Sequence, residues 1–359
     1  MFQLGGAQVH LAGFRRREPA CEAIGDTGAL DLGLVGDGAL AARAAIILKK
    51  ALSARQWGRA LPKADVIVAR SLELLTLAWA YRLLTRSRAR LVYECLDIHR
   101  VMFSQGLAGR IMRLWERFLL RRSGLVITSS PAFAQSYFAA IQKRRRGVVL
   151  VENKLAPGVS APEAAHPPPN SPPWRIGWFG MIRCAKSLDV LRAVCAAAAG
   201  RVEVIIAGRV SYGEFEDFHA QVDCSPYIRF LGPYEPEDLA RLYGQTHFVW
   251  AIDYFEEGQN SAWLLPNRIY EGSAYGSVPL ALASVETGRW LMRQNAGVAL
   301  PDDLVPALDD FFSNLTSNDY AELARHVARI PRERLVTTRD DCEALVRVIG
   351  ASHRNGAGL

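Results

Sequence analysis

The sequence predicts an α/β protein built from two doubly wound domains. Short apolar runs rich in β-branched residues alternate with amphipathic helical patterns along nearly all of the 359 residues, and this alternation is typical of parallel sheets flanked by helices. A chain of 359 residues exceeds the usual size of one core, so two domains are expected. Residues 155–173 hold seven of the eighteen prolines, which indicates an exposed linker between two similar halves.

The linker sets the predicted boundaries. We expect a first domain over 1–154, the linker over 155–173, a second domain over 174–330 and a C-terminal helix and tail over 331–359. The last helical patterns, 319–330 and 340–350, follow the final strand and could pack back on the first domain.

Each half contains five predicted strands. Those of the first half are Val9–Phe14, Asp65–Ala69, Leu91–Glu94, Leu125–Thr128 and Val148–Val151, with helical patterns at 40–56, 72–86, 107–122 and 131–142. Those of the second half are Arg175–Phe179, Val202–Ala207, Ile228–Leu231, Phe248–Ile252 and Val278–Ala281, with helical patterns at 187–199, 214–222, 236–244, 266–275, 288–294 and 304–315. In such domains ligands bind at the carboxyl ends of the strands.

The first residues depart from this pattern. MFQLGG is typical of the last turn of a helix, capped by Gly5 and Gly6 and followed directly by a strand. A doubly wound domain normally begins with a central strand before that helix, so we expect the first strand of the N-terminal domain to be missing.

Positive charge is concentrated in one region. The formal net charge is +7, yet residues 100–150 alone hold ten basic residues against one acid, Glu116.

The helix predicted at 107–122 has an apolar side and a basic side. Its apolar side carries Leu107, Ile111, Leu114, Trp115, Phe118 and Leu119, and its basic side carries Arg110, Arg113, Arg117 and Arg121. Such a helix either covers its own core with a solvated polar face or docks on an anionic membrane surface. The membrane is favoured over nucleic acid, because no nucleic-acid-binding motif accompanies the charge.

The sequence lacks the patterns that are typical of zinc-binding, secreted and membrane-spanning proteins. The six cysteines show no CxxC and no metal-ligand spacing, which indicates reduced thiols in a cytoplasmic protein rather than a zinc site. No signal peptide or membrane-spanning apolar run is present in the sequence.

The segment 260–279 is the most informative part of the second half. Pro266 suits a helix start and Gly276 a helix end. Asn267, Arg268 and Glu271 then share one helix face. This cluster suits an anionic, ribose-bearing ligand, although a capped surface helix with an internal ion pair is an equal alternative.

Two further segments place polar groups at predicted strand ends. In GWFGMIRCAK, Arg183 and Lys186 precede a helix and would suit a diphosphate; the alternative is that they are solvated loop charges. Arg209 follows the next strand and adds a third cation at the same sheet edge. In YECLDIHR, Asp97 could be a general base, with His99 as its partner or alternative. A structural capping role is at least as good an interpretation for Glu94.

Several segments together resemble GT-B glycosyltransferases of the bacterial succinoglycan exopolysaccharide type, related to glycosyltransferase family 4. They are LAGFRR, VYECLDIHR, TSSPAFAQSYF, VENK, WFGMIRCAKSLDVL, NSAWLLPNRIYEGSAYGSVPLA and ETGRWL. The resemblance implies two Rossmann-like domains facing each other across a cleft, with a UDP- or GDP-linked sugar held by the second. Arg183 and Lys186 would then contact the diphosphate and Glu271 the ribose. Asn267 and Arg268 would contact the phosphates or the sugar, and the loop Glu286-Thr287-Gly288 would add backbone N–H groups.

The resemblance also implies an acceptor and a location. The acceptor would be a saccharide on a polyprenyl diphosphate. The first domain would bind this acceptor at the inner face of the plasma membrane. No metal or other cofactor is expected, because the donor half has no DxD pair beside a strand and cationic side chains can offset the diphosphate charge.

One position departs from the family pattern. Retaining members carry a glutamate eight positions before the ribose glutamate, where this chain has Trp263. Asp97 is therefore the base if the enzyme inverts, and it orients substrate if the enzyme retains. A nucleotide-sugar epimerase on the same fold and a non-catalytic nucleotide-binding scaffold are the alternatives.

Overall fold

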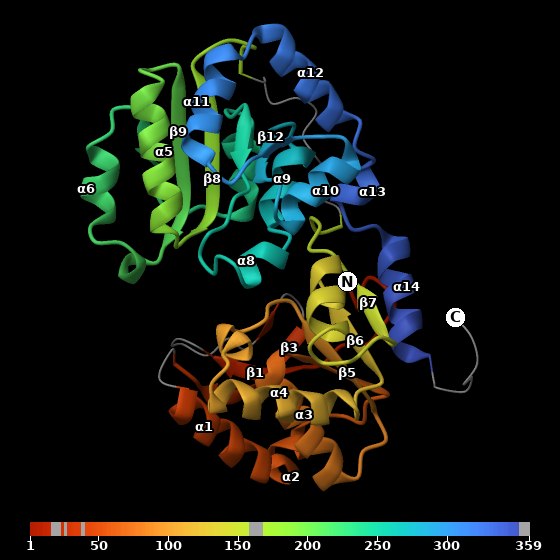
Figure 1. The fold of residues 1–359 in the computed structure, drawn as a ribbon. Coiled ribbons are helices and arrows are strands. Elements are labelled where there is room, and N and C mark those ends of the chain that lie inside the picture. Colours follow the sequence, from red (N-terminus) through yellow and green to blue (C-terminus); the bar gives the residue numbers. More distant parts are fainter. Residues whose placement is uncertain (16–22, 25–26, 37–39, 158–167, 352–359) are drawn as a thin grey trace. The chain divides into compact units, whose positions relative to one another are not determined.

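The computed structural model describes residues 1–15, 23–24, 27–36, 40–157 and 168–351 (Figure 1). Cys21 and most of the Pro-rich stretch, 158–167, lie outside the described residues. The chain divides into two compact units. The first comprises Met1–Val151 and the segment from Thr338 onward, and the second comprises Glu152–Thr337.

The first unit contains seven strands and five α-helices among its described residues. The strands are β1 (Leu11–Arg15), β2 (Ala23–Ile24), β3 (Thr27–Leu34), β4 (Val66–Arg70), β5 (Arg90–Cys95), β6 (Leu125–Thr128) and β7 (Val148–Leu150). The helices are α1 (Leu40–Leu52), α2 (Ala54–Trp57), α3 (Ser71–Thr85), α4 (Leu107–Leu120) and α14 (Arg339–Gly350). Shorter pieces are the 3₁₀ turns η1 (Gly58–Ala60) and η2 (Arg100–Phe103) and the π-helical η3 (Phe133–Ala139).

These strands form two separate sheets. β4, β5, β6 and β7 make a parallel sheet in that order, whereas β1 pairs with β3 in parallel and β2 with β3 in antiparallel. Among the described residues, β4 pairs with no strand other than β5. The chain's first residues form a turn that packs on α14, since a Cβ added to Gly5 would clash with the carbonyl oxygen of Cys342.

Helix α14 belongs to the first unit, beside β7 in Figure 1. Leu345 and Ile349 pack into the core formed by Val92, Leu125 and Ile127. Nη1 of Arg90 donates to the carbonyl oxygens of Val348, Ile349 and Ala351, at 2.8, 2.8 and 2.7 Å. The chain thus returns to this unit at Thr338, while α12 (Ser317–Ala328) stays in the second.

The second unit is one parallel sheet with helices on both faces. Its strands are β8 (Trp174–Ile182), β9 (Val202–Val210), β10 (Ile228–Phe230), β11 (Phe248–Trp250), β12 (Val278–Leu282) and β13 (Val298–Leu300). Its helices are α5 (Ala185–Ala197), α6 (Phe218–Asp223), α7 (Leu239–Tyr243), α8 (Asn260–Trp263), α9 (Asn267–Ala274), α10 (Glu286–Gln294), α11 (Leu304–Asn314), α12 and α13 (Arg332–Leu335), with 3₁₀ turns η4 (Tyr212–Glu214) and η5 (Pro236–Asp238).

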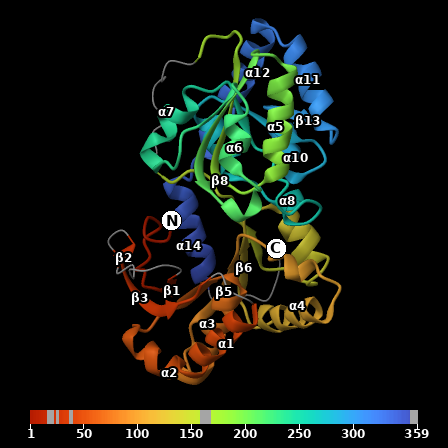
Figure 2. The same ribbon diagram turned by 90° about the vertical axis from the view of Figure 1, so that its left-hand side faces the viewer.

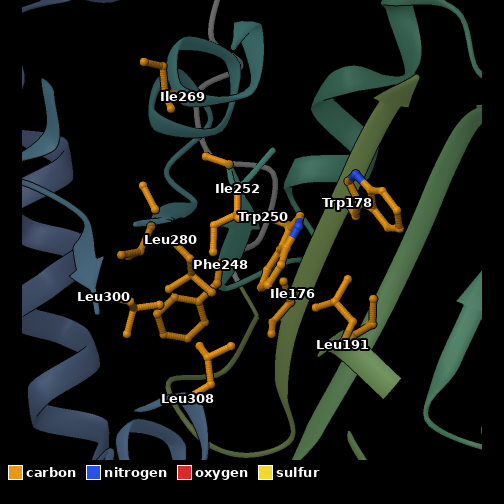
Figure 3. Packing of buried hydrophobic residues seen from close by; sticks show 14 of the residues in the cluster. Ile176, Trp178, Leu191, Phe248, Trp250, Ile252, Ile269, Leu280, Leu300 and Leu308 are labelled. Atoms are coloured by element: carbon orange, nitrogen blue, oxygen red, sulfur yellow. The ribbon is translucent and has the colours of Figure 1, made fainter. Parts of the chain in front are cut away.

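The strand order is β10-β9-β8-β11-β12-β13, and all neighbours are parallel. Alternate strand residues face opposite sides. Ile176, Trp250 and Leu280 join Leu191 of α5 and Leu308 of α11 in the main core (Figure 3). A smaller core on the other face holds residues of β8, β9, β11 and α7: Phe179, Ile205, Ala207, Leu242, Tyr243 and Val249. Figure 2 shows α5 and α7 on opposite sides of β8.

Strands β8 and β9 run three residues beyond the ends predicted for them. Met181 pairs with Arg209 and Ile182 with Val210 in register. Gly180 and Gly208 have φ values of 118° and 140°, and a Cβ on Gly208 would overlap the carbonyl oxygen of Gly180. The glycines of GWFG and AGR therefore permit a close approach of two strands. Arg209 lies inside β9, so the prediction that it follows the strand is wrong.

Candidate functional site

The cations that follow β8 lie against the loop after β11. Nζ of Lys186, in the first turn of α5, lies 2.7 and 2.8 Å from the two carboxylate oxygens of Glu257 and 4.2 Å from the ring centroid of Tyr254. Nη2 of Arg183 lies 3.7 Å from Oδ2 of Asp253, and its Cζ lies 4.4 Å from the ring centroid of Phe255. Both cations are thus paired with acids and aromatic rings rather than merely solvated.

Hydrogen bonds order this loop. Oδ1 of Asp253 accepts from the backbone N–H of Phe255 at 2.8 Å and from Oγ of Ser261 at 3.2 Å. The same Ser261 hydroxyl accepts from the backbone N–H of Glu256 at 2.9 Å. The sequence predicted no role for the loop acids Asp253 and Glu257, although Asp253 directly follows the strand predicted at 248–252.

Helix α9 forms where the sequence predicts it. Pro266 precedes its first residue, and Gly276 follows its end with φ +85°. Asn267 is exposed, whereas Glu271 is partly buried, and its Oε2 accepts from the hydroxyl of Tyr243 at 3.0 Å. Burial raises the pKa of Glu271, while the Tyr243 hydrogen bond and the charge of Arg268 lower it. The alternative of an exposed helix face with an internal ion pair does not describe this carboxylate.

Aromatic residues surround Glu271. Tyr243 stacks on Tyr275 with ring centroids 5.6 Å apart. Tyr234 follows β10, and burial together with the nearby charge of Glu271 raises its pKa to about 12, with Arg268 opposing. In the part of the chain that the structure describes, Nη1 of Arg268 is buried and has no hydrogen-bond partner. The start of α9 therefore places a carboxylate and an unsatisfied cationic N–H beside the loop that follows β10.

The segment Glu286-Thr287-Gly288 is the first turn of α10, so its description as a loop is wrong. Both oxygens of the buried Glu286 carboxylate pair with arginines, at 3.0 Å from Nε of Arg289 and 2.7 Å from Nη2 of Arg293. Thr287 donates to the carbonyl oxygen of Leu264 at 3.1 Å. A Cβ on Gly288 would clash with the carbonyl oxygen of Leu282, so glycine permits α10 to pack against the end of β12. The side chains of Glu286 and Thr287 therefore make structural contacts. The predicted contact with the donor can come only from the backbone N–H groups of this turn.

The candidate base lies in the first unit, just past β5. Asp97 is exposed, and Nδ1 of His99 accepts from the backbone N–H of Val101 at 3.2 Å at the start of η2. Burial and nearby arginines lower the pKa of His99, which favours the neutral ring. Glu94 pairs with Arg70 of the neighbouring strand, at 2.7 and 3.2 Å. Glu94 therefore makes a cross-strand ion pair and not the loop cap that the sequence predicted.

Comparison with known proteins decides the family. A model of the glycosyl transferase 4-like domain matches residues 5–154. The succinoglycan biosynthesis protein ExoL of Rhizobium meliloti is 43% identical over 379 aligned residues, covering 99% of this chain and 94% of that protein. The chain belongs to the glycosyl transferase 4-like family. It is a glycosyltransferase.

Solved structures agree on the fold of this glycosyltransferase. Anabaena Alr3699/HepE, solved in complex with UDP and glucose, is 17% identical with a TM-score of 0.63, covering 89% of this chain and 84% of that one. Sucrose-phosphate synthase from Thermosynechococcus elongatus is 15% identical with a TM-score of 0.66, covering 93% of this chain and 86% of that one. The two units are the Rossmann-like halves of a GT-B fold.

Helix α4 of the glycosyltransferase is turned differently from the prediction. Nη1 of Arg113 donates to the carbonyl oxygens of Met102 and Ser104 at 2.8 and 2.7 Å, and Nη2 of Arg117 donates to that of Ile141 at 2.7 Å. Through these hydrogen bonds Arg113 and Arg117 hold the helix against its own unit, whereas the side chains of Arg110 and Arg121 are exposed. The expectation that all four form one free basic face is wrong, because two of them satisfy backbone carbonyls. In the part of the chain that the structure describes, every helix is too short or too polar to cross a bilayer.

The buried side of α4 carries a carboxylate, Glu116, whose burial the sequence did not predict. Glu116 accepts hydrogen bonds from the hydroxyl of Tyr93 at 3.1 Å, from the hydroxyl of Tyr137 and from Nε2 of Gln142 at 2.5 Å. Burial raises the pKa of Glu116 to about 7, although the three donors oppose the shift. Tyr137 lies in the π-helical η3, whose irregular turn brings it to this carboxylate.

Proposed function

We propose that the second unit binds a nucleotide-diphosphate sugar, UDP- or GDP-linked, and that the enzyme transfers the sugar to a lipid-linked saccharide in exopolysaccharide synthesis. The observation that carries the proposal is the set of cations Arg183, Lys186 and Arg268 with the carboxylate Glu271, which lie in segments joining the strands of one parallel sheet. Ligands bind such sheets at the carboxyl edge. The UDP and glucose in the Anabaena structure, and the succinoglycan biosynthesis named for the Rhizobium protein, support the same reaction class.

Each group has a role that its surroundings support. Arg183 and Lys186 would bind the diphosphate through charge-assisted hydrogen bonds, exchanging the loop carboxylates for phosphate oxygens. The unsatisfied Nη1 of Arg268 would donate to a phosphate or sugar oxygen, with the exposed Asn267 beside it. Glu271 would accept from the ribose hydroxyls, and the first N–H groups of α10 would add to the phosphate site.

The reaction breaks the bond between the anomeric carbon and the diphosphate oxygen while an acceptor hydroxyl bonds to that carbon. The nucleoside diphosphate leaves with the bonding electron pair, and the acceptor proton passes to a base. With inversion, Asp97 is that base, and a neutral His99 would hold the hydroxyl or replace Asp97. With retention, the donor phosphate takes the proton and Asp97 orients the acceptor. The side-chain cations supply the charge compensation, so the proposal requires no metal.

The acceptor would be a saccharide on a polyprenyl diphosphate, bound by the first unit. The excess of basic residues over 100–150 supports an anionic acceptor and a site on the inner face of the plasma membrane, with the enzyme otherwise in the cytoplasm.

Calorimetric titration with UDP and GDP tests the donor site. Lys186→Ala should weaken binding of the preferred nucleotide by about tenfold, because a charge-assisted contact worth about 1.5 kcal/mol is lost. Arg192→Ala, on the same helix α5 and beside Asp189, is the matched control and should bind as the parent does. Equal affinity in Lys186→Ala and the parent would remove this cation from the site.

A further inference from the structure

Helix α4 presents large apolar side chains to solvent. Leu107, Ile111 and Leu114 are 74%, 56% and 55% exposed. At about 100° per residue these three and Phe118 lie within about 60° of one another around the helix. They form one row along its outer face, which we term the α4 apolar row: Leu107, Ile111, Leu114 and Phe118.

The outer face of the helix is more apolar than is usual for a surface in contact with water. Its buried residues are Gly109, Glu116, Leu119 and Leu120. A carboxyl group is thus inside while three aliphatic side chains face out. Burying each aliphatic side chain is worth about 1.5–3 kcal/mol, so this orientation suits a helix whose outer face meets an apolar phase.

Aromatic residues continue the row onto α3. Trp79 of α3 makes edge contacts with Trp115 and Phe118 of α4, with ring centroids 5.6 and 5.4 Å apart. The indole N–H of Trp115 donates inward to Oγ1 of Thr76 at 2.9 Å. Leu83, one turn beyond Trp79, is also exposed. Tryptophan beside an exposed apolar row is typical of side chains at a membrane–water interface.

Positive charge borders the row. Arg110 and Arg121 lie on one side of it, and Arg122 lies on the other with its Cζ 3.5 Å from the ring centroid of Phe118. The turn Lys143–Arg146 lies near the end of α4, because Nη1 of Arg144 donates to the carbonyl oxygen of Leu120 at 2.6 Å. The single acid of residues 100–150, Glu116, is buried, so no negative side chain of this region offsets the charge at the surface.

We propose that the α4 apolar row inserts into the interface of an anionic lipid bilayer, with the bordering arginines on the lipid phosphates. The helix lies in the plane of the interface, as helices with an apolar face and basic flanks do. The arginine stems rest on apolar surface while their guanidinium groups remain with the headgroups. This rests on the proposed function only for the kind of acceptor, and the docking itself is independent of donor binding.

Vesicle flotation of the full chain tests the insertion. The protein should float with phosphatidylcholine vesicles that contain phosphatidylglycerol, and part of it should stay bound at about 1 M salt, where the Debye length is only about 3 Å. The variant Leu107→Ser/Ile111→Ser/Leu114→Ser should lose about tenfold or more of this binding. Leu48→Ser/Leu52→Ser removes two leucines of α1 that are 61% and 74% exposed, and it should float as the parent does. Equal loss in both variants, or no loss in the first, overturns the proposal.

A fluorescent label reports depth directly. In a Cys224→Ser background, which removes an exposed native thiol, Ile111→Cys carrying an environment-sensitive dye should shift to the blue on adding anionic vesicles. The same label at Leu52→Cys should not shift. An unchanged spectrum at residue 111 overturns insertion, as does a dimer that forms without vesicles and is lost in the triple variant. Thermal shifts with UDP and GDP, measured on the same variants, separate failure of docking from failure of the donor site.

Discussion

Nζ of Lys186 lies 2.7 Å from Oε1 of Glu257 and 2.8 Å from Oε2, so the cation proposed for the donor diphosphate is held by a carboxylate of its own chain. The pair is exposed on both sides, which makes it weak and exchangeable. A diphosphate that binds Lys186 must displace this carboxylate, so Glu257 competes with the donor.

Glu257→Gln should therefore tighten nucleotide-diphosphate binding about two- to fivefold, the range expected from releasing an exposed ion pair. Calorimetric titration measures the change. Glu343→Gln, which removes a similar exposed carboxylate from α14, should leave the affinity unchanged. Weaker binding in Glu257→Gln would mean that this carboxylate contacts the donor instead of competing with it.

Glu271→Gln should weaken nucleotide binding by at least about tenfold, because a charged acceptor for two hydroxyls becomes a neutral amide. Tyr243→Phe removes the hydroxyl that donates to Glu271 but keeps the carboxylate, so its effect should be smaller. The two affinities are compared in one titration series. Unchanged affinity in Glu271→Gln would exclude it from the ribose contact.

Asp97→Asn should lower the rate of sugar transfer by about 100-fold or more while donor affinity stays within a factor of about two. Glu94→Gln, three residues earlier, breaks the pair with Arg70 and serves as control for nearby charge loss. Retained transfer in Asp97→Asn together with lost transfer in His99→Ala would assign the base to His99.

Glu116→Gln should stabilise the protein at alkaline pH. The folded protein holds the Glu116 carboxyl at a pKa of about 7 against an ordinary 4.5, so folding favours the protonated form. Its contribution to stability is complete below about pH 4.5 and is lost as pH rises through 7, a change of about 3 kcal/mol. Urea unfolding at pH 5 and pH 8 should show a gain for Glu116→Gln only at pH 8. A variant less stable at both values would show that the three hydrogen bonds outweigh burial.

The sequence predicted most strands and helices because buried parallel strands read as apolar runs and surface helices as amphipathic patterns. It missed β2, β3 and β13. The two glycines and Asp31 of β3 resemble a turn, but in the structure the Asp31 carboxylate pairs with Arg15 of the neighbouring strand. The segment 131–142 was expected as an ordinary helix, and its central part is π-helical.

The site could be predicted only where one segment carries it. Asn267, Arg268 and Glu271 stand out because a single short helix brings them together. The pairing of Lys186 with Glu257 spans 71 residues, and spacing along the chain cannot reveal it. For α4, the periodicity of the sequence predicted the apolar row, but it did not show which side of the helix faces the core. Gly109, packed against the carbonyl oxygens of Val101 and Ser104, and the buried Glu116 decide that orientation through tertiary contacts.

The most direct test of the account is a thermal-shift screen of the parent chain against UDP, GDP, ADP and their sugar conjugates. A ligand that binds only the native state raises the melting temperature as its concentration exceeds its dissociation constant. The account predicts stabilisation by one nucleotide family, UDP or GDP, and its loss in Arg268→Ala. A folded sample that none of these nucleotides stabilises would contradict the donor site and with it the proposed reaction.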